Sequence, residues 1–217
     1  MTTFPGSPKL LKGGLVLVDP DSAAVRRVIV LQYNPETVSR SLQIPAAGEG
    51  AQTEALRIKG PPVETIKIEA EIDATDQLEF PELHPNTVEL GLHPQIAALE
   101  TVVYPTTTAL QHNYELAGEG TLEIVPMESA LVLFVWSKSR VVPVRLTEFS
   151  VTEEAFDTAL NPIRAKVSLG MRVLTVDDLG FDHQGGSLYM AYHRHKETLA
   201  AKVGSGALGT LGIEGIR

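Results

Sequence analysis

The sequence predicts a β-rich α+β fold, built of packed β-sheets or a barrel with a short helix and a C-terminal helix. Three observations predict it. Apolar and polar residues alternate over residues 65–72 and 163–174, as they do in strands with one buried face. β-branched residues dominate residues 14–44 between clear turn signals. Near the C-terminus, apolar residues instead recur at spacings of three and four, which is typical of an amphipathic helix.

The first part of the chain predicts three short strands rich in β-branched residues, at 15–18, 25–33 and 38–44. Asp-Pro-Asp-Ser at 19–22 supplies turn chemistry for the first connection. Asn34-Pro35 supplies it for the second, because the residue before a proline is disfavoured in the helical region. A meander is the simplest arrangement of these three strands.

The most regular strand pattern follows a long loop that we expect over residues 45–62, which are rich in Gly, Pro and Glu. Ile66, Ile68, Ala70 and Ile72 occupy every second position, so one face is apolar and the other is charged. Asp-Ala-Thr-Asp at 73–76 ends this strand. A short helix is then expected at 95–103, stopped before Pro105, and residues 105–129 are expected to be mostly irregular.

The second half predicts three further strands, at 131–136, 141–151 and 163–174, and a helix at 187–202 that Ser187 would cap. The tail at 203–217 is Gly-rich and too sparse in apolar residues for a core element. We therefore expect an N-terminal extension at 1–13, one domain at 14–202 with insertions at 45–62 and 105–129, and the tail. The 45–62 loop and the tail are expected to be mobile until neighbouring subunits order them.

Composition limits the classes of function. The chain has 217 residues, of which 43% are hydrophobic, and this is enough for a real core. Its formal net charge of -9 argues against nucleic acid as a partner, since phosphate binding needs clustered Lys and Arg. The absence of cysteine excludes disulfides and thiolate metal sites. No apolar stretch is long enough for a secretory signal or for direct membrane insertion, so a soluble protein made in the cytoplasm is expected.

No pattern in the chain points to catalysis, a cofactor or a metal. His193 and His195 lie two apart on a predicted helix and therefore point to different faces. Asp73, Asp76 and Glu79 lack the glycine and the ligand spacing of a calcium loop, and a strand-ending turn explains the aspartates. Phe134 and Trp136, in an apolar run, are expected to belong to the core. The sequence therefore favours a non-catalytic subunit of an assembly.

Three segments, taken together, resemble one family: VIVLQYNP at 28–35, IEAEIDAT at 68–75 and NPIRAKVSLGMRVL at 161–174. They are similar, in order and spacing, to the tube-type domain of contractile injection systems, the phage-tail-like particles of bacteria. The resemblance implies a phage tail-tube-like fold of packed sheets and a sixfold ring at the junction of baseplate and inner tube, which initiates or adapts the tube. Many relatives carry a C-terminal peptidoglycan-binding LysM module, which we do not expect here.

The resemblance also implies the partners and the place of assembly. The expected partners are further copies of the chain and the inner tube, spike or hub, and baseplate proteins of the same particle. Assembly would take place in the bacterial cytoplasm, and the particle would act there or be released. No cofactor is implied.

The candidate assembly interface combines the turn after the second strand with two charged strand faces: Tyr33, Asn34, Pro35, Lys67, Glu69, Glu71, Asp73, Arg164, Lys166 and Arg172. The face through residues 67–73 is mainly acidic and that through residues 164–172 is basic. Two interpretations stay open. The faces pair between neighbouring subunits of a ring, where a weak cross-strand attraction is repeated, or they are solvated faces that never meet.

Two other classes of protein remain as alternatives. A small-ligand-binding β-barrel would need short-looped strands around a pocket. A carboxylate-dependent hydrolase would need an acid pair such as Asp73 and Glu154, brought together by the fold with perturbed pKa values.

Overall fold

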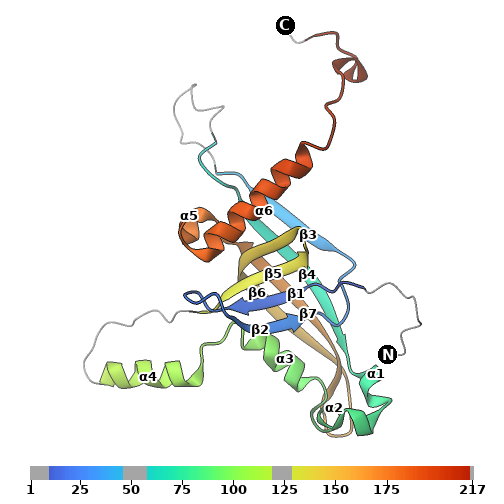
Figure 1. The fold of residues 1–217 in the computed structure, drawn as a ribbon. Helices are drawn as coiled ribbons and strands as arrows, with labels where there is room; N and C mark the ends of the chain where they lie inside the picture. The colour runs from blue at the N-terminus through green and yellow to red at the C-terminus, as the bar shows by residue number, and fades with distance from the viewer. Residues whose placement is uncertain (1–9, 46–57, 119–128, 216–217) are drawn as a thin grey trace.

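The computed structural model describes residues 10–45, 58–118 and 129–215 (Figure 1). The described residues form one antiparallel sheet of seven strands, in the order β2-β1-β5-β6-β7-β4-β3. The strands are β1 (Gly14–Val18), β2 (Val25–Val30), β3 (Val38–Gln43), β4 (Val63–Asp73), β5 (Leu131–Ser137), β6 (Arg140–Phe156) and β7 (Pro162–Val173). The helices are α1 (Thr75–Leu78), α2 (Pro85–Leu90), α3 (His93–Glu100), α4 (Thr107–Gly118), α5 (Val176–Leu179) and α6 (Gln184–Ala200), with 3-10 turns η2 (Pro81–Leu83) and η3 (Leu208–Leu211).

The α+β class is confirmed, because the described residues combine an antiparallel sheet with several helices. The sheet is single and open, so the expected barrel or set of packed sheets is wrong for the described residues. The edge strands β2 and β3 do not pair with one another. β2 ends at Val30, earlier than expected, and the Gln32 side chain then bonds to the backbone of Asp73 at the end of β4. Its amide donates to the Asp73 carbonyl at 2.7 Å and accepts from the Asp73 amide at 2.9 Å. Pro35 then lacks the N–H that a continuing ladder needs.

The expected meander of the first three strands is also wrong. β1 and β2 do form a hairpin, in which Leu15 faces Ile29. β3 instead pairs with β4, with Val38 opposite Ile68, and so lies at the far edge of the sheet (Figure 1). Two strands that are close in sequence can lie at opposite edges of a sheet, because each strand pairs with the partner that buries the most apolar area. The local sequence pattern does not say which partner that is.

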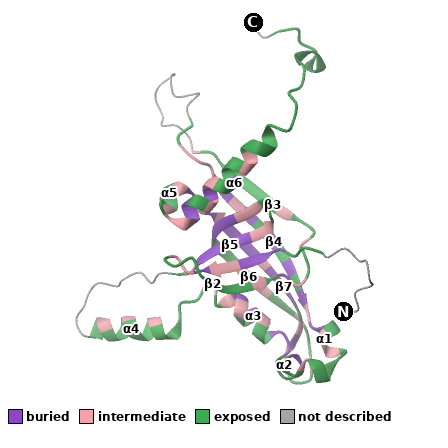
Figure 2. Cartoon of the chain, viewed as in Figure 1, coloured by how far each residue is buried: buried purple, intermediate pink, exposed green. Residues whose placement is uncertain are grey.

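The main core lies on one face of the sheet, which we call the inner face, and many of its residues belong to strand segments drawn purple in Figure 2. α3 contributes Ile96 and Leu99 to it, and α6 contributes Tyr189 and Tyr192. Fully burying one aliphatic side chain, such as that of Ile96 or Leu99, stabilises the folded state by roughly 1.5–3 kcal/mol. The inward residues of the strands follow the predicted alternation, and Phe134 is among them: Ile66, Ile68, Ala70, Ile72, Phe134, Val142, Val144, Ala165, Val167, Leu169, Met171 and Val173.

The C-terminal helix begins earlier than expected, and Ser187 lies inside it rather than at its cap. α6 starts at Gln184, and Nδ1 of His183 caps it by accepting from the Gly185 amide at 3.0 Å. Gly186 explains the early start. A Cβ at this position would lie 1.9 Å from the Gly180 carbonyl oxygen, so only glycine allows the first turn to pack against the preceding segment.

Residues 107–118 form α4, which corrects the expectation that this region is irregular. The signal was present, because the Thr106 hydroxyl accepts from the Ala109 amide at 3.2 Å and a run of helix formers follows. The predicted helix at 95–103 is confirmed as α3, two residues earlier at its start. The 45–62 loop lies largely outside the described residues, as do the ends of the extension and of the tail and part of the 105–129 insertion. No helix in the described ranges is long and apolar enough to cross a membrane.

Candidate assembly surface on the outer face of the sheet

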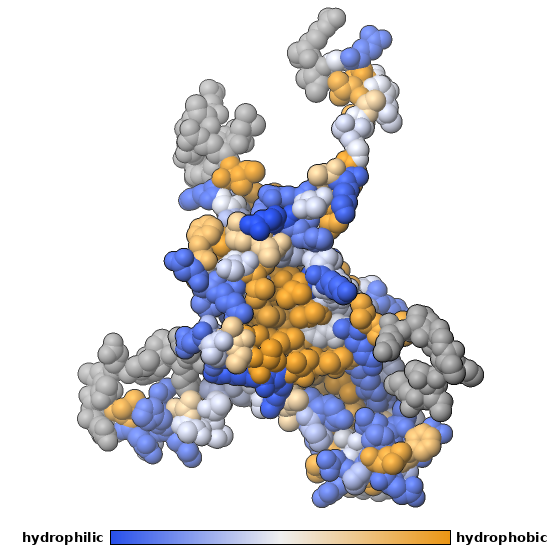
Figure 3. All heavy atoms as spheres, viewed as in Figure 1, coloured by the Kyte–Doolittle hydropathy of each residue, from blue (hydrophilic) through white to orange (hydrophobic). Residues whose placement is uncertain are grey.

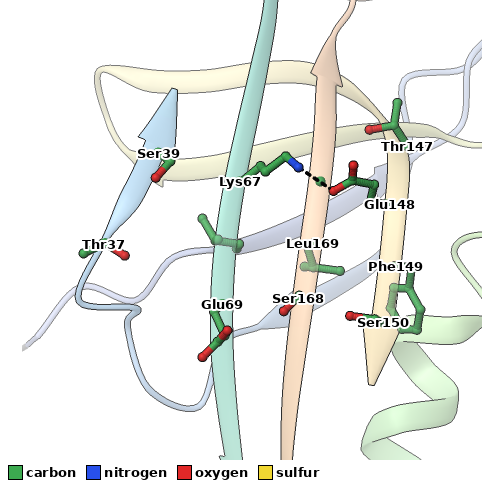
Figure 4. A pocket seen from close by; sticks show the side chains of 12 residues that line it. Thr37, Ser39, Lys67, Glu69, Thr147, Glu148, Phe149, Ser150, Ser168 and Leu169 are labelled. Atoms are coloured by element: carbon green, nitrogen blue, oxygen red, sulfur yellow. Dashed lines mark hydrogen bonds and ion pairs between the residues drawn. The ribbon is translucent and has the colours of Figure 1, made fainter. Parts of the chain in front are cut away.

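The outer face of the sheet divides into a polar half and an apolar half. The polar half is formed by β3, β4, β7 and the second part of β6, and we call it the polar face. It holds an open groove of about 750 Å³, lined among others by Ser39, Lys67, Glu69, Glu148, Ser168 and Gly170 (Figure 4). Small hydroxyl side chains and glycine leave the groove hollow, and charged side chains form its walls.

The strand register places the predicted acidic and basic rows side by side on this face. In the pairing of β4 with β7, Glu71 faces Lys166, Asp73 faces Arg164, and Lys67 faces Gly170. The two rows therefore meet within one subunit, so the interpretation of two faces that never meet is wrong, and pairing between subunits stays a prediction. Any attraction between subunits must use the charges that remain unpaired.

Ion pairs within the subunit neutralise all three residues of the basic row. Arg164 Nε lies 2.9 Å from Asp73 Oδ2, and Lys166 Nζ lies 3.4 Å from Glu154 Oε1. Arg172, beyond the groove, pairs with Asp178 at 2.7 Å. Glu69 and Glu71 are exposed and make no ion pair with any described residue, so the polar face keeps a net acidic character.

Lys67 and Glu148 close one end of the groove by pairing across an intervening strand. Their charged atoms lie 2.7 Å apart, and both residues face Gly170, Lys67 from β4 and Glu148 from β6. Figure 4 shows this ion pair passing over β7. A Cβ at position 170 would lie 2.9 Å from Glu148 Cβ, so the glycine leaves room for the bridge. A bulge between Leu146 and Glu148 brings the acid into register.

The turn after β2 has a structural role. Asn34 Oδ1 accepts from the Gly13 amide at 2.9 Å, and its Nδ2 donates to the Leu11 carbonyl at 2.8 Å. Asn34 thereby holds the segment that leads into β1. Tyr33 is partly exposed, and the Gln32 bridge places this turn near the Asp73 end of the polar face. The structure thus brings the seven predicted strand residues together on the outer face, and it places Tyr33, Asn34 and Pro35 in the turn that Gln32 links to Asp73.

A buried charged cluster at the opposite end of β4 was missed by sequence reasoning. Glu64 accepts from Arg40 Nε at 2.7 Å, from Lys196 Nζ at 2.8 Å and from the Tyr192 hydroxyl at 3.0 Å. Burial raises the pKa of Glu64, but the hydrogen bonds and charges of Lys196 and Arg40 outweigh it and lower the pKa below its usual value. The signal was in the alternation, because residue 64 shares the inward positions of Ile66 and Ile68.

The apolar half of the outer face, which we call the apolar patch, is formed by β2, β1, β5 and the start of β6. Figure 3 shows apolar side chains gathered where Figure 1 draws β1, β2 and β5. Val18, Leu131 and Leu133 lie under the first part of α6, whereas the side chains toward β2 become increasingly exposed. The partly or largely exposed members are Val16, Val25, Val28, Val30, Val135 and Val141.

The carboxylates proposed for hydrolysis are held by cations. Burial raises the pKa of Asp73, but hydrogen bonds from Thr75 and Arg164 outweigh burial and lower it. A general acid needs the opposite shift. His193 Nε2 lies 3.5 Å from Glu197 Oε1 along α6, and no group of three or more metal-ligating side chains occurs in the described ranges.

A scan against protein-family models and a search of curated proteins give no match to the chain.

Proposed function

We propose that the protein is a structural, non-catalytic subunit of a phage-tail-like contractile injection system. It forms a ring, sixfold as the family resemblance implies, at the junction of baseplate and inner tube, where it initiates or adapts the tube. Its partners are further copies of itself and the tube, hub and baseplate proteins of the particle. The proposal combines the resemblance of three segments with the surface that the fold leaves uncovered.

The observation that carries the proposal is that both edge strands of the sheet, β2 and β3, are exposed. Every residue of β2 is exposed except Ile29, and Val25, Val28 and Val30 are each more than half exposed. At the other edge, five of the six residues of β3 are exposed, and Leu42 is 51% exposed. Proteins that act alone protect such edges with charge, proline or a covering element, because unpaired strand edges associate. Open edges of this kind suit a subunit that neighbours complete.

The polar face supports the same role. Its charged side chains are arranged as ion pairs around a groove that is open to solvent, and each carboxylate with a shifted pKa is held in its charged form. Such a face suits contact with water or with a polar neighbour, since the groove that the described residues form is open and lined largely by polar side chains.

The proposal is tested by measuring mass and symmetry. The full chain is purified alone and after co-expression with the tube and baseplate proteins of a contractile injection system from the same genome, and native mass spectrometry and electron microscopy record its state. We expect closed rings of six copies in at least the co-expressed sample. A strictly monomeric chain in both samples contradicts the proposal.

A matched pair of variants connects the result to the edges. Leu42→Lys places a charge on the outer edge strand β3, and Glu82→Lys changes charge in the exposed turn η2 without touching an edge or the apolar half of the outer face. If ring formation uses the open edge, the first variant reduces the ring fraction and the second does not. Equal ring fractions show that the β3 edge is not part of the contact.

A further inference from the structure

The apolar patch is a sheet face without a covering layer. A sheet with an apolar face is stable when another layer buries that face, and a helix layer is the commonest solution in α+β proteins. Here α6 covers only the end of the patch where Leu131 and Leu188 meet. Toward β2 the apolar side chains stay open, with Val28 and Val30 at 57% and 58% exposure. Exposed apolar areas of this kind mark interaction sites.

α4 is a helix without a core. It stands away from the sheet in Figure 1, and none of its residues is buried. Three of its apolar residues nonetheless lie on one side of the helix, since Leu110, Tyr114 and Ala117 are spaced by four and three. Tyr114 is 82% exposed. Isolated helices of this length are marginally stable in water, so α4 needs a surface against its apolar side.

The two uncovered features match in size and charge. A helix of 12 residues is about 18 Å long, and the four strands of the patch span three strand spacings, or about 14 Å. α4 has one carboxylate, Glu115, and no Lys or Arg. Lys138 in the β5–β6 turn and Arg140 at the start of β6 lie beside Val135 and Val141 of the patch, and they make no ion pair with any residue that the structure describes.

We propose that α4 of one copy lies across the apolar patch of the next copy, which makes α4 the arm that joins neighbouring subunits. This rests on the proposed ring assembly. Within a single chain, α4 stands away from its own patch (Figure 1). Arm and patch are different surfaces of the same protein, so the contact they make is head-to-tail, and a head-to-tail contact generates a ring when its rotation closes. It follows the helix-on-apolar-surface mode of recognition.

The absence of cysteine from the chain allows a direct test by disulfide formation. Val28→Cys is made in the full chain with one affinity tag, and Tyr114→Cys is made in the full chain with a tag of different mass. His112→Cys, on the opposite side of α4, is the matched control for Tyr114→Cys. The variants are mixed under ring-forming conditions, oxidised mildly, and analysed by non-reducing gel and mass spectrometry, with native mass spectrometry of the same sample.

We expect the Val28–Tyr114 mixed dimer to form at least ten times faster than the Val28–His112 dimer. Rings without this excess overturn the arm contact and leave the ring proposal standing. The excess without sixfold rings supports the arm contact and contradicts the proposed function. A chain carrying Val28→Cys and Tyr114→Cys together is expected to give linked oligomers; an internal disulfide in a monomer shows that α4 covers its own patch and overturns the inference. A chain that neither associates nor cross-links overturns both.

Discussion

Glu64→Gln is expected to destabilise the fold by about 2 kcal/mol at neutral pH. Glu64 is 3% exposed and receives hydrogen bonds from β3 and α6, so it joins the helix to the sheet edge. Breaking a fully buried ion pair costs about 3–5 kcal/mol, whereas an exposed pair contributes about 0.2–1 kcal/mol. Arg40 and Lys196 are 29% and 35% exposed and can recover hydration, so the cost lies between these limits.

The pH dependence has a definite sign. The folded-state pKa of Glu64 is depressed, so its contribution to stability is present above the unfolded value of 4.5 and is lost as the pH falls through the folded value. The gap in stability between wild type and Glu64→Gln should therefore be constant near neutral pH and shrink below about pH 4.5.

Urea unfolding at several pH values, followed by fluorescence of Trp136, measures this gap. Glu69→Gln, an exposed carboxylate on the same strand, is the matched control and should change stability by less than about 0.5 kcal/mol. If Glu64→Gln is no more destabilising than this control, or if its effect is unchanged in acid, the cluster does not hold α6 to the sheet by charge.

Three further substitutions have defined outcomes. Gly170→Ala should reduce the free energy of unfolding by about 1 kcal/mol, because the new methyl group meets Glu148 and displaces the bridge across β7. Gln32→Ala should reduce it by about 1–3 kcal/mol and speed amide exchange at Asp73, since both backbone groups of that residue lose their partner. Glu71→Lys should reduce the free energy of unfolding by less than about 1 kcal/mol, because the new cation faces Lys166 on β7. It should also lower the ring fraction, because it removes an unpaired carboxylate from the polar face.

Each of these substitutions has a control. Gly204→Ala adds a methyl group in open space, and Gln43→Ala removes an exposed amide on β3, so neither should move the urea midpoint measurably. For Glu71→Lys, the control is Glu71→Gln, which should cost less stability because it places no second cation opposite Lys166. An unchanged rate of amide exchange at Asp73, or unfolding free energies indistinguishable from the controls, would contradict the corresponding contacts.

Alternation by itself was enough to place β4 and β7 and to separate their faces. The inward set from Ile66 to Ile72 and the outward charges of β4 and β7 follow from a period of two, which any strand must obey. Composition alone likewise excluded disulfides and disfavoured a nucleic-acid partner. These properties are local or summed over the chain, so no knowledge of neighbours is needed to derive them.

Neighbours were decided only by the tertiary structure. β2 and β3, expected side by side, lie at opposite edges, and Glu64 finds Tyr192 and Lys196 at sequence separations of 128 and 132 residues. The acidic row of β4 lies beside the basic row of β7 because burial of the inward apolar residues fixes the register of these two strands. A strand pattern states which face is buried and does not state against which strand, since pairing is selected by packing over the whole sheet.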